Sequence, residues 1–345
     1  MRGTMTAYRL VRWGEPPQLT EVPVPEPGPG EVLVEVAATG LCHSDLDMAR
    51  MPGEVGEALG WRLPFTLGHE VAGHVAALGP GVDGPPPGAA VVLVSPASCG
   101  ACDACRRGRD SACPHGTAGR GYGRDGGLAR YVTAPARSVV PLVDGVDPVA
   151  AAPLTDAGAT AHHAVDRVAP RLEAGSTAVV VGVGGVGAFA VQILRARTPA
   201  RVVAVDVDPV RREVAAGLGA DEVLPDVGAL AGLGGAEVVL DVVGTDATIA
   251  AGLAAVRPWG AFGLVGAGGG TFRRPWFGGL PRDAEIFTFQ GSSIADLHAV
   301  VALAAAGAVR SEVEEWPLSQ VTAAYAALAR GGLRGRIVVV PDDGA

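Results

Sequence analysis

The 345-residue sequence contains no lysine and no asparagine, so all 27 of its basic side chains are arginines. We attribute this to a bias of the coding sequence and not to function. Charged residues make up only 18% of the chain, its formal net charge is −9, and its pI is near 5.3. An acidic chain is a poor ligand for nucleic acid or for an anionic membrane surface. We therefore expect neither as a partner.

The N-terminal segment MRGTMTAYRL lacks the apolar stretch that a secretory signal peptide needs. We therefore expect a cytoplasmic protein, in which disulfide bonds are rare. An uncharged run from Gly175 to Leu194 is long enough to span a bilayer. Its glycines, and the strand and aspartate that follow it, favour a buried βα unit instead. We expect no membrane-spanning segment.

The length of the chain favours two domains. The first part consists of short strands and turns: residues 31–37 alternate like a half-buried strand, and proline and glycine cluster on both sides of it. From residue 178 onward, β-branched runs alternate regularly with apolar-periodic helices. This pattern predicts an α/β protein with a β-rich part and a doubly wound parallel sheet.

The segment from Ala178 to Asp206 carries a dinucleotide-binding pattern. A strand at residues 179–181 leads into glycines at 182, 184 and 187 in G-x-G-x-x-G register, and a helix, a second strand and Asp206 follow. The glycines allow a tight turn, close approach of a pyrophosphate and close packing of helix on strand, while the acid accepts hydrogen bonds from the ribose. No basic residue directly follows Asp206, since Arg211 is five positions on. The pattern therefore predicts NAD in preference to NADP.

Four of the five cysteines lie close together with C-x2-C-x2-C-x7-C spacing, at positions Cys99, Cys102, Cys105 and Cys113. This spacing is typical of a closed tetrahedral zinc site. Disulfide bonds are the alternative, which the expected reducing compartment opposes. Cys42 stands apart from the four and is available for a different role.

Two short motifs in the first part contain zinc-ligand residue types. One is GLCHSD at residues 40–45, with Cys42, and the other is GHE at residues 68–70, with His69. Each alone is compatible with a structural role, because buried cysteines often act as small hydrophobes and single histidines are often packed in a core. Together they offer a thiolate and an imidazole. Asp156, in PLTDAG, precedes a predicted helix and is also interpretable as its N-cap; His162 and His163 further along are interpreted as ordinary packing or solvent-facing residues.

These motifs, in this order and spacing, resemble the zinc-dependent medium-chain alcohol dehydrogenases. The PLTDAG run makes the sequence most similar to bacterial NAD-dependent secondary-alcohol dehydrogenases. The resemblance implies a GroES-like β-rich catalytic domain at residues 1–155, with a structural zinc lobe at 95–115. It further implies a Rossmann NAD-binding domain at residues 156–292, a doubly wound parallel sheet, and a return of residues 293–345 to the catalytic domain.

The resemblance also implies roles for individual residues. Cys42, His69 and Asp156 would hold a catalytic zinc ion, with aspartate in place of the cysteine of many relatives, and the four clustered cysteines a structural one, giving two zinc ions per chain. Ser44 would take the substrate proton, Asp45 would orient His69, and Glu70 would approach the metal during ligand exchange. Asp47 departs from the family pattern, since many members have a histidine there as the outer end of a proton relay.

Contacts to NAD are expected from the glycine motif, from Asp206 and from positions matched to the family. His43 and Arg336 are expected near the pyrophosphate, and the backbone around residues 264–267 beside the nicotinamide. The full expected set is His43, Gly182, Gly184, Gly185, Val186, Gly187, Asp206, Arg211, Val243, Val265, Gly266 and Arg336.

The resemblance implies a reaction that interconverts an alcohol, expected to be secondary, and its ketone or aldehyde by hydride transfer to or from NAD, in a cleft between the two domains. A biosynthetic carbonyl reductase, a zinc-free enoyl or quinone reductase and a non-catalytic NAD-binding protein are the alternatives. The substrate itself is not predicted; Met48, Trp61 and residues near Trp276 are candidate pocket walls that could equally belong to a core or an interface. We expect a homodimer or homotetramer, with residues 262–268 available to pair across a subunit boundary.

Overall fold

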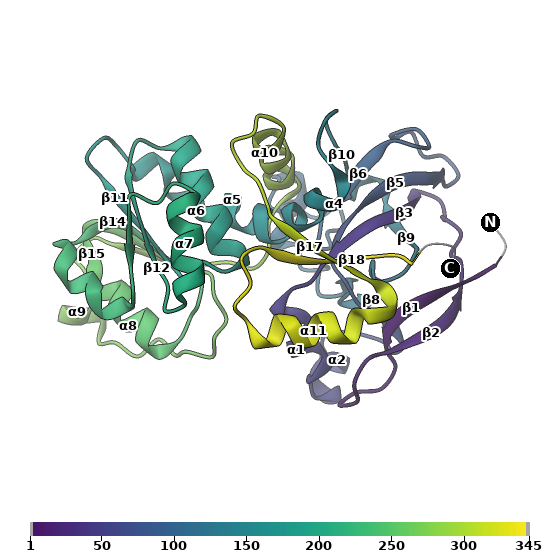
Figure 1. Cartoon of the computed structure of the whole chain (residues 1–345), viewed down its shortest axis with the longest axis horizontal. Helices are drawn as coiled ribbons and strands as arrows, with labels where there is room; N and C mark the ends of the chain where they lie inside the picture. The colour runs from purple at the N-terminus through teal and green to yellow at the C-terminus, as the bar shows by residue number, and fades with distance from the viewer. Residues whose placement is uncertain (1–2, 343–345) are drawn as a thin grey trace. The chain divides into compact units, whose positions relative to one another are not determined.

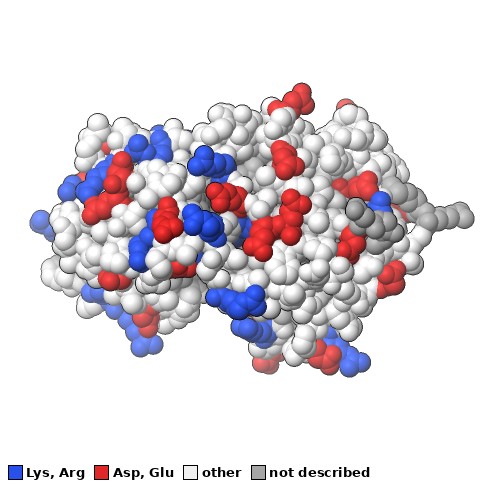
Figure 2. All heavy atoms as spheres, in the orientation of Figure 1, with Lys and Arg blue, Asp and Glu red and all other residues white. Residues whose placement is uncertain are grey.

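The computed structural model describes residues 3–342, which form two compact units. Unit 1 is formed by the described residues up to Ala159, by Gly291–Gly331 and by those from Gly335 onward, and unit 2 by Thr160–Gln290 and Gly332–Arg334. Within residues 3–342, no helix is both long enough and apolar enough to cross a bilayer. On the face shown in Figure 2, basic and acidic side chains are interspersed, and neither sign forms a continuous patch.

Unit 1 is built on a seven-stranded mixed sheet (Figure 1). Along the sheet the strands are β10 (Val139–Pro141), β6 (Ala90–Leu93), β5 (Glu70–Leu78), β3 (Glu31–Gly40), β18 (Arg336–Val340) and β17 (Val313–Pro317), with β9 (Tyr131–Pro135) also paired to β3. A smaller sheet contains β2 (Gln18–Pro23), β1 (Thr4–Leu10) and β4 (Phe65–Thr66), and β7 (Gly119–Arg120) pairs with β8 (Gly123–Arg124).

The alternating sequence of β3 explains the core of unit 1. Val32, Val34 and Val36 point to one side and pack with buried valines of β5 and β6, including Val71 and Val91. Strand β18, from the C-terminal part of the chain, pairs antiparallel with β3 through Val338 and Val339. The main sheet of unit 1 therefore contains both early and late segments of the chain.

Helices of unit 1 lie between these strands in the sequence. The longer ones are α1 (His43–Ala49), α2 (Gly53–Ala58), α10 (Ile294–Ala305) and α11 (Val321–Arg330), and the short ones are α3 (Asp103–Arg106) and α4 (Pro148–Ala151). Ser293 begins α10 as a capping box, because its hydroxyl accepts from the Asp296 N–H while the Asp296 carboxylate accepts from the Ser293 N–H.

Unit 2 contains a six-stranded, fully parallel sheet with helices packed on it (Figure 1). Its strand order is β13 (Glu222–Leu224), β12 (Arg201–Val205), β11 (Thr177–Val181), β14 (Ala236–Asp241), β15 (Val256–Leu264) and β16 (Glu285–Thr288). The helices are α6 (Gly185–Arg197), α7 (Pro209–Gly217), α8 (Asp246–Ala255) and the short α9 (Trp276–Gly279), while α5 (Ala157–Val168) enters from unit 1. The central strands are buried on both faces, as their continuous valine runs predict.

The strand order of unit 2 reverses between β11 and β14. From β11 the chain moves outward to β12 and β13, then returns to add β14, β15 and β16 on the other side. This reversal is the topological switch point of a doubly wound sheet, where such folds bind dinucleotides beyond the carboxyl ends of the strands. The α/β class with a doubly wound parallel sheet, predicted from the sequence, is confirmed.

Two predictions about the strands of unit 2 need correction. The run EVVLDVV predicts a strand over residues 237–243, but β14 ends at Asp241. The Asp241 Oδ1 accepts hydrogen bonds from the N–H groups of Val243 and Gly244 at 2.9 Å each and turns the chain. The prediction that residues 262–268 pair across a subunit boundary is wrong for the strand part. Phe262 lies within β15, which is paired on both sides, and the sheet ends at β16 instead.

Candidate active site

Four predicted site residues of unit 1 converge at one end of the β3–β5 pair. Gly40 at the end of β3 pairs with Glu70 at the start of β5, so Cys42, two residues later, comes close to His69, one residue before β5. Asp156 reaches the same place from the turn just before α5. One ligand atom from each of Cys42, His69, Glu70 and Asp156 lies within 4.8 Å of the others.

The spacing of these atoms fits a tetrahedral zinc ion. Asp156 Oδ2 lies 3.8 Å from Cys42 Sγ and 3.5 Å from His69 Nε2. Ligands bound to zinc at about 2.0–2.3 Å in a tetrahedron are themselves about 3.3–3.8 Å apart. The buried imidazole of His69 and the partly buried thiol of Cys42 and carboxylate of Asp156 offer the donor types that zinc prefers.

Asp45, on α1, supports two of these side chains. Its Oδ1 is 3.1 Å from His69 Nδ1, and its Oδ2 accepts a hydrogen bond from the Cys42 N–H at 3.1 Å. Asp45 and His69 are both buried. A hydrogen bond from Nδ1–H to a carboxylate leaves the Nε2 lone pair available for a metal. The orienting role predicted for Asp45 requires this hydrogen bond, and the role itself stays a prediction.

Glu70 forms a buried ion pair with Arg336, which comes from β18. Arg336 Nη2 lies 2.5 and 2.6 Å from the two carboxylate oxygens of Glu70 and donates a further bond to the Leu41 carbonyl at 3.0 Å. Burial raises the pKa of Glu70, and the charge of Arg336 opposes this shift. A Cβ at Gly40 would lie only 2.0 Å from Glu70 Oε2, so Gly40 makes room for this carboxylate. The predicted contact of Arg336 with the cofactor pyrophosphate stays a prediction.

Tyr122 belongs to the site but was not predicted from the sequence. Its hydroxyl lies 3.1 Å from Ser44 Oγ and 3.2 Å from His69 Nε2. The ring centroids of Tyr122 and His69 are 4.7 Å apart. Burial raises the pKa of Tyr122, so the phenol is protonated at neutral pH. The residue sits between glycines of the segment GRGYGRDGG, where no spacing rule points to chemistry. Only the fold brings it to His69 and Ser44.

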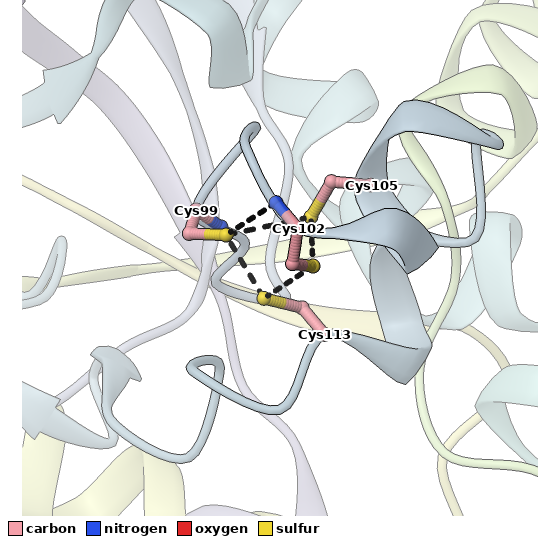
Figure 3. Close-up of side chains that lie close together, drawn as sticks. All are labelled: Cys99, Cys102, Cys105 and Cys113. Atoms are coloured by element: carbon pink, nitrogen blue, oxygen red, sulfur yellow. Dashed lines mark hydrogen bonds between the residues drawn. The ribbon is translucent and has the colours of Figure 1, made fainter.

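The four remaining cysteines form a second cluster (Figure 3). Their sulfurs point toward one another, with Sγ–Sγ distances of 3.5 Å for Cys102–Cys105, 3.8 Å for Cys102–Cys113 and 4.0 Å for Cys99–Cys105. Four thiolates around one zinc ion lie about 3.8 Å apart. All five cysteines of the chain are free thiols, so the disulfide alternative is not what the structure shows.

Backbone amides support the thiolate form at one end of this cluster. Cys99 Sγ accepts from the N–H groups of Ala101 and Cys102 at 3.4 and 3.3 Å, and these bonds lower the pKa of Cys99 to about 6. Burial raises the pKa of Cys105 to about 11. Deprotonated sulfur is the form that binds a metal. Turns that present N–H groups to sulfur are therefore suited to a metal-binding lobe.

The glycine motif forms the turn between β11 and α6 in unit 2. Gly182 has a φ of +88°, which favours glycine, and a Cβ at Gly187 would lie 1.8 Å from the Gly182 carbonyl oxygen. Asp206 Oδ2 accepts from the Val183 N–H at 2.7 Å and its Oδ1 from the Asp208 N–H at 2.9 Å. The acid thus joins the turn to the end of β12. The N-terminus of α6 has no side-chain cap and its amides remain available for an anion.

Other predicted cofactor residues gather near this turn at the carboxyl ends of the strands. The N–H groups of Val265 and Gly266 donate to the Asp241 carbonyl at 2.9 and 3.0 Å, and a Cβ at Gly182 would lie 2.5 Å from Val243 Cγ2. Arg211 Nη1 would lie 2.9 Å from a Cβ at Gly184. These residues of unit 2 lie together, as do Gly185 and Val186 at the start of α6; their contacts with NAD stay predictions.

The remaining predicted positions have mixed surroundings. His43 and Asp47 are exposed on α1, whereas Met48 on the same helix is buried. Trp61 is buried, its ring lies 6.0 Å from the ring of Tyr122, and its Nε1 donates to the Thr117 carbonyl at 2.7 Å. The side chain of Trp276 lies outside the described residues. His162 is buried with its Nε2 2.8 Å from Arg197 Nη1, and His163 packs against Phe289, both as ordinary structural contacts.

Family models match segments that together cover much of the chain. The model of the alcohol dehydrogenase GroES-like domain matches residues 28–144, and that of the zinc-binding dehydrogenases matches residues 185–306. An NAD-dependent alcohol dehydrogenase of Sulfurisphaera tokodaii is 32% identical, over 98% of this chain and all of that protein. The chain belongs to the zinc-dependent medium-chain alcohol dehydrogenase family.

Solved structures of this family share the fold over nearly the full length. The alcohol dehydrogenase of Aeropyrum pernix superposes with a TM-score of 0.90 at 34% identity, covering 97% of this chain and 100% of that one. The acetophenone reductase of Geotrichum candidum, solved in complex with NAD, gives a TM-score of 0.89 at 30% identity, covering 99% and 98%. The predicted GroES-like and Rossmann architecture of the medium-chain dehydrogenases is thereby confirmed.

Proposed function

We propose that this protein is an NAD-dependent alcohol dehydrogenase that interconverts a secondary alcohol and its ketone. The observation that carries the proposal is the convergence of Cys42, His69 and Asp156 at zinc-ligand separations. Zinc at this site and NAD on unit 2 are the cofactors that the family uses. We further propose a second, structural zinc ion held by the four cysteines of Figure 3, which gives two ions per chain.

The residues of unit 1 prepare a site for the substrate oxygen. When bound, zinc supplies a Lewis acid that lowers the pKa of the substrate hydroxyl, and the nicotinamide supplies the hydride acceptor. Asp45 fixes the ring of His69, and Asp156 contributes an oxygen donor that is harder than the second thiolate found in many relatives. Glu70, held by Arg336, is poised beside the ligands.

Ser44 accepts the proton that the alcohol releases. Its Oγ lies at the start of α1, 3.1 Å from the hydroxyl of Tyr122. His69 Nε2 would no longer accept a hydrogen bond once it held a metal, and the Tyr122 hydroxyl would then donate to Ser44 Oγ or to the substrate oxygen. Both groups are hydroxyls that accept and donate, which suits a short proton path. In this proposal Asp47, which is exposed and lies three residues after Ser44 on α1, passes the proton to solvent.

Asp206 selects NAD over NADP in this proposal, because its carboxylate repels a 2′-phosphate. The test compares the ratio of kcat/KM for NAD to that for NADP in Asp206→Gly and Asp206→Asn. The second variant keeps the size of the side chain that receives the Val183 and Asp208 N–H groups and removes the charge. Both variants are expected to gain on NADP; a ratio unchanged in both would remove this role from Asp206.

The reaction is tested by NADH absorbance with primary, secondary and allylic alcohols, together with elemental analysis. We expect oxidation of secondary alcohols in preference, close to two zinc ions per chain, and loss of activity in Asp156→Ala. One zinc ion or none would favour a zinc-free enoyl or quinone reductase. Full zinc content without oxidation or carbonyl reduction would favour a non-catalytic NAD-binding protein. A much higher kcat/KM for ketone reduction would identify the biosynthetic reductase among these candidates.

We propose that the protein is a homodimer joined through the free edge of β16 in unit 2. This strand ends the sheet, and Ile286 on it and Trp259 nearby are 37% and 73% exposed. An unpaired strand with exposed apolar side chains is a template for pairing with a second copy. Sedimentation should show a dimer for the protein and a monomer for Ile286→Lys, while a tetramer would require a further interface.

The five free cysteines support a reducing, cytoplasmic location.

A further inference from the structure

Arg120, the second residue of β7, is a buried cation without an acidic partner. The residue is 8% exposed, and its one hydrogen bond to a described residue runs from Nη1 to the Val94 carbonyl at 3.1 Å. Within residues 3–342, no carboxylate forms an ion pair with it. Two other arginines, Arg9 and Arg336, also have an enclosed Nε without a hydrogen bond, but they pair with Asp125 and Glu70. Arg120 differs from them in having no counter-charge.

A buried guanidinium without a counter-ion is energetically unfavourable. Burial lowers the pKa of Arg120 to about 10, so the group is still positively charged at neutral pH. Removing a charge from water without pairing it costs several kcal/mol, about as much as a small domain can tolerate at one position. Such a group is expected where an anion completes it.

The position of Arg120 relates it to the candidate zinc site of unit 1. Gly121 packs so closely on Gly68 that a Cβ there would lie 2.9 Å from the Gly68 carbonyl, one residue before His69. Tyr122, two residues after Arg120, contacts His69 Nε2 through its hydroxyl. In the antiparallel pair of β5 and β6, Leu93 lies opposite Val71, so the next residue, Val94, comes opposite Glu70. Arg120 therefore lies on a strand beside the segment that leads to His69, two residues before Tyr122, and its guanidinium bonds the Val94 carbonyl just after β6.

One donor of Arg120 remains available to a ligand. Nε is enclosed and has no partner, and Nη1 is taken by the Val94 carbonyl. Nη2 makes no hydrogen bond to a described residue. Unlike Nε, it is not enclosed by the protein, so solvent reaches it. The small exposed fraction of the residue thus includes a cationic donor, and a charge-assisted bond at such a donor is stronger than a neutral one.

We propose that Arg120 binds an anionic group of the substrate, so that the enzyme acts on alcohols that carry a carboxylate and on the matching oxo acids. This inference rests on the proposed function, whose substrate it narrows. The hydroxyl of such a substrate lies at the zinc site beside Ser44 and Tyr122, while the carboxylate accepts a hydrogen bond from Arg120. A neutral alcohol leaves the guanidinium without its counter-charge.

The experiment compares hydroxy carboxylates with their methyl esters, with the hydroxyl on carbon 2, 3 or 4, in the zinc-loaded enzyme with NAD. For the chain length that fits, we expect kcat/KM to favour the carboxylate by about 10- to 100-fold, as a hydrogen bond to a charged group provides. Arg120→Met should bring this ratio close to one, mainly through KM, and Arg120→Lys should retain part of it. Arg124→Met, which removes an exposed arginine paired with Arg120 across β7 and β8, is the matched control and should keep the original ratio.

A ratio at or below one for every chain length in the original enzyme, or an equal ratio in Arg120→Met, would overturn the proposal. A second measurement does not depend on turnover: butyrate should raise the melting temperature of the original protein and of Arg124→Met, but not of Arg120→Met, and butyramide should raise none of them. An equal butyrate shift in all three would also overturn it. If no alcohol is oxidised at all, the proposed function fails, while the butyrate shift still decides whether Arg120 binds a carboxylate.

Discussion

Asp45→Asn should lower the zinc affinity of the proposed catalytic site, although Asp45 is not itself a proposed zinc ligand. One buried carboxylate serves both the His69 Nδ1 and the Cys42 N–H, each at 3.1 Å. Asparagine has one acceptor oxygen, so its NH2 group must face one of these two partners. If it faces His69, the imidazole moves its proton to Nε2 and loses the lone pair for the metal; if it faces Cys42, the start of α1 is pushed away.

The size of the effect follows from the role of such partners. Loss of a carboxylate that orients a ligating histidine lowers metal affinity by about 10- to 100-fold, which corresponds to about 1.4–2.7 kcal/mol. The assay titrates the protein with a zinc chelator and counts the zinc left per chain by elemental analysis. Asp45→Asn should release one zinc ion at a chelator concentration about 10- to 100-fold lower and retain the other, which the four cysteines hold.

The matched control is Asp47→Asn on the same helix, where the side chain is exposed. It should release zinc as the original protein does. Equal zinc release by the two variants would refute the orienting role of Asp45. Loss of both zinc ions from Asp45→Asn, together with a large fall in melting temperature, would show that Asp45 stabilises the fold generally and would refute the specific reasoning.

Three further predictions concern other parts of the chain. Gly40→Ala should displace Glu70 from Arg336 and lower the free energy of unfolding by up to about 3 kcal/mol in denaturant titration, whereas Gly217→Ala, where a Cβ meets no atom within 4 Å, should not. Glu285→Gln should cost at most about 1 kcal/mol at pH 7, since its pairs with Arg167 and Arg171 are partly exposed. Burial opposes these arginines, but they lower the pKa of Glu285 below its ordinary value. The loss should therefore shrink as the pH falls through the ordinary pKa of glutamate and then through the lowered pKa of the folded protein, and a loss constant with pH would contradict this. Cys102→Ala should lower the melting temperature and Asp156→Ala the activity; equal, mild effects in both would contradict the assignment of two different sites.

Residue order and local pattern were enough to predict much of the fold. The valine strands, the glycine turn and the helices of unit 2 follow from periodicities that depend on near neighbours in the chain. The residues at which strands and helices end were less predictable. The end of β14 at Asp241, for example, is set by the Asp241 side chain, which accepts hydrogen bonds from the backbone just after it. Pairing on a sheet depends on distant segments, which is why Phe262 was expected at a boundary and lies inside the sheet.

The candidate site was predictable to the extent that its residues lie in recognisable motifs. Cys42, His69 and the four clustered cysteines are in such motifs, and the structure brings them into two groups. Tyr122 and Arg120 are not, since a tyrosine or an arginine in a glycine-rich loop has no distinguishing pattern. Their significance comes from contacts with His69 and with the strand end at Val94, which only the folded chain creates.

The position of β18 in the middle of the main sheet of unit 1 has a consequence for biosynthesis. All six strands of unit 2 lie between Thr177 and Thr288, so its sheet can be completed while the ribosome is still adding residues. The large sheet of unit 1 must wait for Arg336–Val340, and with them for the arginine that neutralises Glu70. During synthesis the sheet of unit 2 is therefore ready first, and the sheet of unit 1, beside which the candidate zinc ligands lie, is completed only once β18 has emerged.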